Sequence, residues 1–300
     1  MRIDTPPNNP CNETRHIVDE LIEERAHRLR RHPLLWKLIT NTLYPILDYQ
    51  RTKDMVDVIA PMNGMQVFNY LSGMLDLSIE VSGVEQIPTT GRAMLIANHP
   101  GGIADGVAVF DAIKTRRTDV SFFANRDALR ISPEMIDHII PVEWIEEKRT
   151  RQRQKETVKR MVSAFREDRL VVIFPSGRLA YLTWAGLTER PWQPTAVSLA
   201  QKYQCPIIPM HIKARNSLLF YMLSLISDEL RDMTLFHELL NKTNHPYKMQ
   251  IGSSIEPNGD INALTQALQE YVTQDLANGN TVFTNTLCTT DETSPESAHA

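Results

Sequence analysis

The spacing of apolar residues in the first quarter of the chain is helical. In residues 34–47 the apolar positions recur every three or four residues up to a break near Pro45, and they are Leu34, Leu35, Leu38, Ile39 and Leu43. Residues 19–31 are charged and helix-prone, and residues 55–75 favour further helix. We therefore expect residues 15–76 to form an N-terminal helical region. This region either caps the core or supplies a surface that rests on a membrane.

From residue 77 the pattern changes to short apolar runs that alternate with helical segments. The expected strands are residues 77–81, 93–97, 120–124, 139–142, 170–174, 206–211 and 249–255. The expected helices are residues 106–114, 149–167, 196–202 and 261–276. Such alternation is typical of an α/β fold with a mixed, largely parallel sheet covered by helices. We expect this domain to span residues 77–284.

The two ends of the chain carry no such pattern. Residues 1–14 are rich in Pro and Asn, which predicts a flexible tail. Residues 285–300 are rich in Thr, Ser and Glu, which predicts a disordered tail. The three cysteines are too scattered for a disulfide framework or a cysteine metal site, so we expect a reduced, cytosolic setting; they are Cys11, Cys205 and Cys288.

Composition excludes several classes of protein. With 42% hydrophobic and 23% charged residues, the chain is neither wholly disordered, collagen-like nor a polytopic membrane protein. A net charge of -4 gives no overall attraction to nucleic acid, so no nucleic-acid partner is expected. No secretory signal is visible at the N-terminus. Residues 217–227 resemble a lipid-contacting segment but are too short for a spanning helix, which needs about 20 residues.

The most informative segment follows the apolar run at residues 93–97. It reads Asn98-His99-Pro100-Gly101-Gly102 and continues to Asp105. Sites in α/β sheets lie beyond the carboxyl ends of strands, so His99 is well placed to meet a substrate. The turn lets Asp105 return towards the imidazole, where a carboxylate would orient the ring and leave its other nitrogen free as a base. The alternative is a structural or solvated histidine.

Other polar groups follow neighbouring apolar runs. Phe174-Pro175-Ser176-Gly177-Arg178 ends one of them, and there Gly177 permits close backbone approach while Arg178 offers a fixed positive charge to an anion. Arg126 follows another run, and Pro209 stiffens a third. If these strands are parallel, the groups meet at one edge of the sheet. A surface arginine after a simple turn is the alternative for Arg178.

The order of these motifs resembles the glycerolipid acyltransferase superfamily (PlsC-like, lysophosphatidic acid acyltransferases). The order is Asn-His…Asp, then an arginine after a strand, then Phe-Pro-x-Gly, then Ile-Ile-Pro. More narrowly, NHPGGIADG, FFANR, IFPSGR, RPWQPTA and KARNSLLFY resemble its bacterial branch, often labelled hemolysin-like or lyso-ornithine-lipid-acyltransferase-like. The resemblance covers residues 83–252.

The resemblance implies a role for each matching residue. His99 would be the general base for the acceptor hydroxyl, Asp105 would orient it, and Arg126 and Arg178 would lie near the polar head of the acceptor. The other implied substrate-binding positions are Asn98, Phe174, Pro175, Ser176, Gly177 and Pro209. The implied reaction is direct transfer of a fatty acyl group from acyl-CoA or acyl carrier protein to a lysolipid hydroxyl, without metal or cofactor. The resemblance also implies that the protein is an enzyme of phospholipid biosynthesis and that it is peripheral on the inner face of the cell membrane.

Two departures from the family pattern bear on the acceptor. Five residues separate His99 from Asp105 where the family commonly has four, so the glycines must absorb the extra residue in a loop. Ser176 replaces the Glu of the common Phe-Pro-Glu-Gly-Thr-Arg block, and the Arg comes one position early. A lyso-amino-acid lipid of the ornithine type is therefore an alternative acceptor to lysophosphatidic acid.

Residues 148–169 form a basic stretch, with nine Lys or Arg against three acidic residues. The stretch is either a solvated helix face, a contact for anionic lipid headgroups or a docking site for an acidic acyl carrier protein.

Two other classes of protein remain as alternatives. A non-catalytic lipid-binding protein would need neither His99 nor Asp105. A serine hydrolase would use Ser176, but no Gly-x-Ser-x-Gly elbow surrounds it. A metal site at His99 and Asp105 lacks a third ligand at suitable spacing.

Overall fold

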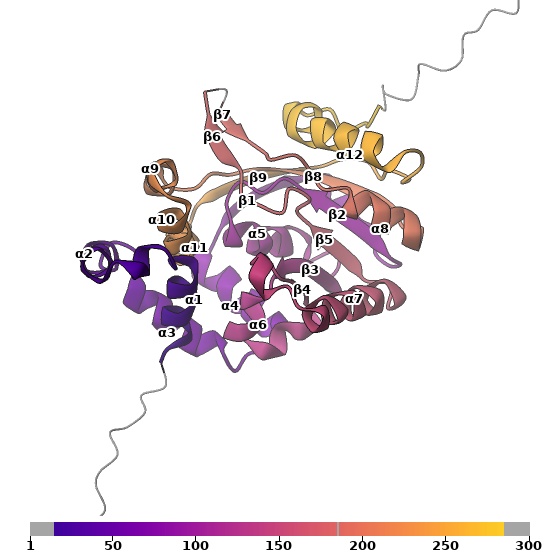
Figure 1. Cartoon of the computed structure of the whole chain (residues 1–300). Coiled ribbons are helices and arrows are strands. Elements are labelled where there is room, and N and C mark those ends of the chain that lie inside the picture. Colours follow the sequence, from indigo (N-terminus) through magenta and orange to yellow (C-terminus); the bar gives the residue numbers. More distant parts are fainter. Residues whose placement is uncertain (1–14, 185, 285–300) are drawn as a thin grey trace, which may run out of the picture.

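A seven-stranded sheet forms the centre of the computed structural model, which describes residues 15–184 and 186–284 (Figure 1). Its strand order is β1-β9-β8-β2-β5-β3-β4. All neighbouring strands are parallel except β8 and β9, which are antiparallel. The strands are β1 (Ser78–Ser82), β2 (Ala93–Ala97), β3 (Val120–Asn125), β4 (Ile139–Val142), β5 (Leu170–Ile173), β8 (Ile207–Lys213) and β9 (Pro246–Ile251). The predicted mixed, largely parallel sheet is confirmed.

The central strand β2 is buried on both faces, as its unbroken apolar sequence indicates. Leu95 packs into one core with α5 and the N-terminal helices, whereas Met94 and Ile96 pack into a second core on the opposite face. The helices of the second face include α7 (Arg151–Arg166), α8 (Thr195–Tyr203) and α12 (Ile261–Glu270). Two layers of helices therefore enclose the sheet and leave its carboxyl edge for the site.

Helix α5 (Ile103–Ile113) begins three residues earlier than the predicted segment 106–114. Gly102, with φ 78°, lies immediately before it, so the chain leaves the turn in a backbone conformation that favours glycine. As a result Asp105 lies in the first turn of the helix rather than in the preceding loop. The short helix α6 (Asp127–Ile131) follows β3.

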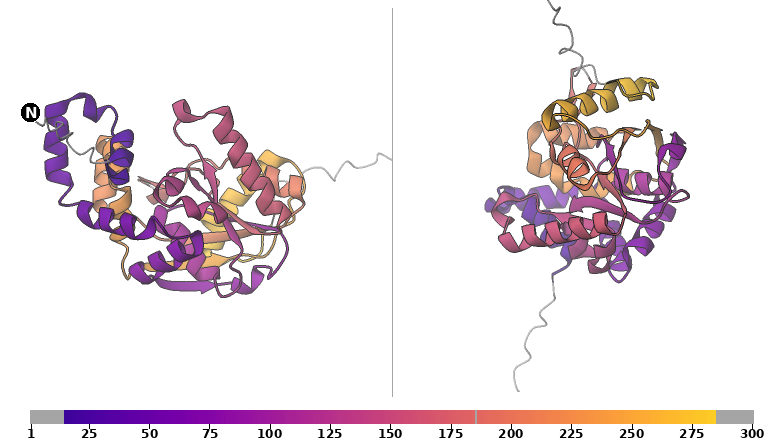
Figure 2. Two further views of the ribbon diagram at one scale, coloured as in Figure 1. Left: turned by 90° about the horizontal axis from the view of Figure 1, so that it is seen from below. Right: turned by 90° about the vertical axis from the view of Figure 1, so that its right-hand side faces the viewer.

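Residues 17–75 are helical, with α1 (Ile17–Arg25), α2 (Pro33–Leu43), α3 (Tyr49–Ile59) and α4 (Gly64–Leu75). Figure 2 shows α1 to α3 at one side of the molecule. Helices α3 and α4 pack into the core, but α2 buries none of its residues and leaves Leu34 88% exposed. The N-terminal helices thus cap the core through α3 and α4, while α2 leaves apolar side chains exposed. The predicted tails at 1–14 and 285–300, with Cys11 and Cys288, lie outside the described residues.

Two parts of the fold were not predicted. Strands β6 (Tyr181–Thr183) and β7 (Gly186–Thr188) form a separate hairpin, because three-residue strands leave too short a pattern to detect. Between β8 and β9 the chain forms α9 (Leu218–Ile226), α10 (Asp228–Met233) and α11 (Leu235–Leu240). Within the described residues, every helix is too short or too polar to cross a bilayer.

A buried ion pair supports the segment between β8 and β9. The Lys242 ammonium lies 3.0 Å from the Glu238 carboxylate, and each side chain is 2% exposed. Glu238 also accepts hydrogen bonds from the backbone N–H and the hydroxyl of Ser217, the residue that caps α9. The pair therefore holds the start of α9 against α11.

Replacing Lys242→Met should destabilise the fold by about 3–5 kcal/mol, because it leaves a buried carboxylate without its cation. Urea denaturation at neutral pH measures this loss. Lys248→Met is the matched control, since Lys248 and Glu80 form an exposed pair that contributes about 0–1 kcal/mol. The double variant Glu238→Gln/Lys242→Met should recover part of the stability. A loss below about 1 kcal/mol for Lys242→Met contradicts the assigned role.

Candidate active site

The turn after β2 is anchored by Asn98. Its side-chain amide donates to the backbone oxygen of Ile212 in β8 at 2.8 Å and accepts from the N–H of the same residue at 2.7 Å. Both polar atoms of the buried amide are therefore satisfied by the neighbouring strand. Asn98 fixes where the turn leaves the sheet and so sets the position of His99.

His99 and Asp105 meet directly across this turn. Nδ1 of His99 lies 2.8 Å from Oδ2 of Asp105, and the backbone N–H of Gly101 donates to the same oxygen at 2.8 Å. Asp105 is fully buried, whereas the His99 side chain keeps 17% of its surface exposed. The Pro-Gly-Gly turn absorbs the five-residue spacing and delivers the carboxylate to the ring.

The rest of the surroundings hold the imidazole in one orientation. The Phe174 ring stacks on the imidazole, with 4.2 Å between ring centroids and 15° between planes. The His99 backbone N–H donates to Oε1 of Glu189 at 2.8 Å, and its carbonyl accepts from the N–H of Ala180 at 3.0 Å. Nδ1 faces the carboxylate, and no described residue hydrogen-bonds Nε2. The arrangement can accept a proton at Nε2 while Asp105 stabilises the imidazolium.

Glu189 is part of the site but was missed by the sequence analysis. Besides the His99 backbone, its carboxylate accepts from the indole N–H of Trp192 at 3.3 Å. Burial raises the pKa of Glu189, and the neighbouring histidine and hydrogen-bond donors oppose that rise. The residue stands in an irregular segment and belongs to no motif. No local signal could have identified it.

Tyr247 of β9 completes the buried side of the site and was also missed. Its hydroxyl oxygen and Oδ1 of Asp105 are both buried without a hydrogen-bond partner among the described residues, and both lie against Gly101. A Cβ at Gly101 would lie 2.5 Å from the Tyr247 hydroxyl and as close to Oδ1. Burial and the charge of Asp105 raise the pKa of Tyr247, which keeps the phenol protonated and available as a donor. Because Gly101 has no Cβ, the Asp105 carboxylate and the Tyr247 hydroxyl can both pack against it.

The loop after β5 lies beside the dyad. The Ser176 hydroxyl donates to the carbonyl of Arg178 at 2.8 Å, and Gly177 has a positive φ of 61°. Pro175 is buried, and Trp144 lies 3.6 Å from the position of a Cβ on Gly177. The Arg178 side chain is exposed, and its guanidinium makes no hydrogen bond or ion pair within the described part of the chain. Its guanidinium is therefore free to meet an anion at this edge.

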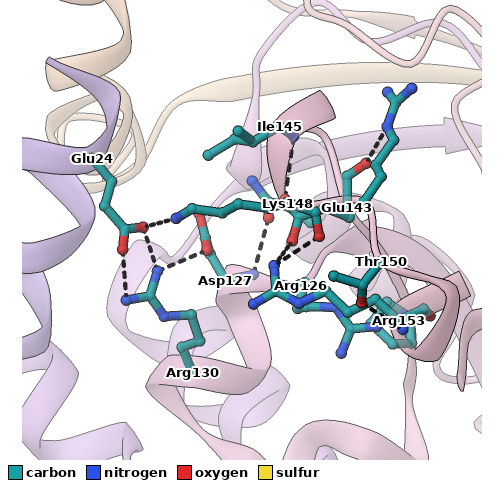
Figure 3. Close-up of polar contacts among 12 residues, drawn as sticks. Glu24, Arg126, Asp127, Arg130, Glu143, Ile145, Lys148, Thr150 and Arg153 are labelled. Atoms are coloured by element: carbon teal, nitrogen blue, oxygen red, sulfur yellow. Dashed lines mark hydrogen bonds and ion pairs between the residues drawn. The ribbon is translucent and has the colours of Figure 1, made fainter. Parts of the chain in front are cut away.

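The structure places Arg126 away from the dyad. It follows β3, two strands from β2, which corresponds to a lateral separation of about 10 Å. Its guanidinium pairs with Glu156 at 2.5 Å and donates to the carbonyl of Arg153 at 3.2 Å. Figure 3 shows the surrounding cluster, in which Arg130 and Lys148 both contact Glu24. A cavity of ≈ 470 Å³ lies among these charged side chains and does not include His99.

Pro209 and a second cavity lie outside the dyad. Pro209 is buried within β8, opposite Ile96, and its carbonyl accepts from the N–H of Gly252 at 2.9 Å. It supports the sheet one residue before the end of β2. The larger cavity, of ≈ 600 Å³, lies between α1, α2 and α3 and contains none of the predicted site residues. Among the described residues, no three His, Cys, Asp or Glu side chains are grouped to hold a metal ion.

Comparison with known proteins gives consistent matches. A family model described as "Acyltransferase" matches residues 78–213. The chain is 26% identical over 188 residues to the lyso-glycine lipid O-acyltransferase of Phocaeicola vulgatus, a match covering 60% of this chain and 65% of that protein. It is 23% identical over 209 residues to the protein of the same name from Bacteroides thetaiotaomicron, covering 69% and 74%. The match thus spans just under two thirds of the first relative.

Among solved structures, the chain is similar to the 1-acyl-sn-glycerophosphate (LPA) acyltransferase PlsC from Thermotoga maritima. The sequence identity is 13% and the TM-score 0.46, with 90% of this chain and all of that chain covered.

Replacing Gly101→Ala should destabilise the fold by about 2 kcal/mol or more, because the new methyl group collides with Asp105 and Tyr247. Gly106→Ala, one turn away in α5, is the matched control. No atom lies within 4 Å of its Cβ position, and alanine favours a helix over glycine by about 1 kcal/mol. Thermal and urea unfolding of both variants measure the difference. Equal stabilities would show that the turn tolerates a side chain.

Proposed function

We propose that the chain is a member of the glycerolipid acyltransferase superfamily and that it is an O-acyltransferase that acylates the hydroxyl of a lyso-amino-acid lipid. The acyltransferase family match over residues 78–213 and the two lyso-glycine lipid O-acyltransferase relatives support this. The observation that carries the proposal is the His99–Asp105 pair, whose Nε2 is free at the carboxyl edge of the sheet. A lipid-binding protein without activity would need no such pair.

The proposed mechanism uses one base and no covalent intermediate on the enzyme. Nε2 of His99 takes the proton of the acceptor hydroxyl as its oxygen attacks the carbonyl carbon of the thioester. The new C–O bond forms, the C–S bond breaks, and the departing thiolate receives the proton from His99. Asp105 stabilises the imidazolium between these steps. Because a thioester is already activated, the proposed reaction needs no cofactor.

The acceptor is proposed from two observations. Both curated relatives are named lyso-glycine lipid O-acyltransferases, and a glycine headgroup ends in a carboxylate. Arg178 supplies an unpaired guanidinium on the loop beside the dyad, and a guanidinium fork binds a carboxylate through two hydrogen bonds. Arg126 already has a carboxylate partner. Lysophosphatidic acid is the alternative acceptor, since a phosphate meets the same arginine.

The donor and the membrane contact are proposed from surface chemistry. Exposed cations of α7, including Arg151, Lys155 and Lys159, suit either the phosphates of acyl-CoA or an acidic acyl carrier protein. The exposed apolar residues of α2 and α9 suit peripheral contact with the inner face of the membrane. Anionic headgroups there would meet the same cations.

His99→Gln should lower acyl transfer by about 10²–10⁴-fold, because it removes the general base without changing the buried surroundings. Thioester consumption is measured with acyl-CoA and with acyl carrier protein against a panel of lysolipids, and mass spectrometry identifies the product. His32→Gln, at an exposed histidine outside the site, is the matched control, and Ser176→Ala tests the serine-hydrolase alternative. Full activity of His99→Gln would exclude the mechanism, and loss of activity only in Ser176→Ala would favour a serine hydrolase.

Arg178→Met should raise the KM for a lyso-glycine lipid by about tenfold or more, because it removes a charge-assisted hydrogen bond worth about 1.5–3 kcal/mol. The effect on kcat should be smaller, since the headgroup stays bound throughout the reaction. Steady-state kinetics check this split, with Lys202→Met, an exposed cation on α8, as the charge-matched control. If both variants raise KM equally, Arg178 has no specific role.

A further inference from the structure

The β6–β7 hairpin exposes an uncovered apolar surface. The exposed fraction is 108% for Trp184 and 54% for Leu182, and Tyr181 and Leu187 are exposed as well. Within the described residues the two strands form a sheet of their own, and neither strand contains a charged residue. A two-stranded hairpin alone is marginally stable in water, so this one gains from a partner that covers it.

Both ends of the hairpin are attached to the backbone of His99. Directly before β6, the N–H of Ala180 donates to the His99 carbonyl at 3.0 Å. Directly after β7, Glu189 accepts from the His99 N–H at 2.8 Å and is itself held by Trp192. The base of the hairpin is therefore held at the site, and Trp184 lies one three-residue strand, about 10 Å of chain, beyond it.

The chemistry of the hairpin distinguishes between its candidate partners. An acidic acyl carrier protein docks on clustered basic residues. The two strands have none, and the guanidinium of Arg190, just after β7, lies over the Tyr181 ring, 5.1 Å from its centroid. A second copy of the chain requires about 20–30 residues on each side for a stable interface, far more than the hairpin offers. Trp and Tyr next to Leu are the side chains that favour the boundary between lipid and water. Only a lipid surface fits all of these features.

We propose that the β6–β7 hairpin inserts into the lipid surface that carries the acceptor. The proposal rests on the proposed function and deepens it, because it names the element that brings the dyad to the membrane. Figure 1 shows the hairpin rising beside α9, whose residues Leu218, Met222, Leu225 and Ile226 are also exposed. In that view the hairpin, α9 and α2 all lie on the upper left of the molecule.

The test measures insertion without requiring turnover. Vesicles of phosphatidylcholine and phosphatidylglycerol that carry bromine at shallow acyl positions should quench the tryptophan emission of the wild-type chain. Trp184→Phe should lose at least half of this quenching. Leu182→Glu/Trp184→Glu should weaken vesicle binding at least tenfold in a flotation assay. Val158→Glu is the matched control, since Val158 is a 52% exposed apolar residue on α7.

The possible outcomes distinguish a lipid surface from a protein partner, and they distinguish failure of hairpin insertion from failure of the proposed acyltransferase function. Circular dichroism checks that the hairpin variants stay folded, as expected for exposed positions. Unchanged quenching in Trp184→Phe, or unchanged vesicle binding of the double variant, overturns hairpin insertion. A change in oligomeric mass or in carrier-protein binding caused by the hairpin variants, with vesicle binding intact, also overturns it. Quenching of Trp184 in a chain that acylates no lysolipid refutes the proposed function and leaves insertion supported.

Discussion

The complete burial of the Asp105 carboxylate is the constraint on which the site depends. A buried charge is tolerated only when donors surround it. Here the Gly101 N–H and His99 Nδ1 contact one oxygen, and the Tyr247 hydroxyl lies on the side of the other. Placing these donors requires the turn after β2, the first turn of α5 and the antiparallel strand β9 together. The dyad is thus a product of the whole sheet rather than of one motif.

Charge pairing decides which cations are available to a ligand. Around Arg126, acidic partners from α1, α7 and the segment after β4 neutralise the arginines and lysines (Figure 3). Arg178 lies on the loop after β5, and its exposed guanidinium has no acidic partner among the described residues. The two arginines at the ends of strands therefore differ, since Arg126 ties α7 to the end of β3 while Arg178 stays open to solvent.

The sheet and the His99–Asp105 pair could be predicted from the sequence because each leaves a local sequence pattern. A central parallel strand must be apolar throughout, as in β2, and His99 and Asp105 are only a short turn apart. Glu189 and Tyr247 leave no such signal. They reach His99 and Asp105 from about 90 and 140 residues away, and only the folded chain brings them there. The β6–β7 hairpin escaped because its strands are short and its apolar side chains point outward.

The sequence alone predicted the class of fold, the candidate pair His99 and Asp105, and the resemblance to the acyltransferase family. These follow from periodicity and from residues within one turn, which local chemistry controls. The tertiary structure alone decided which arginine is unpaired, which distant residues enclose the carboxylate and which apolar residues remain uncovered. Those properties depend on long-range packing, because pairing and burial are set by neighbours that the linear chain does not reveal.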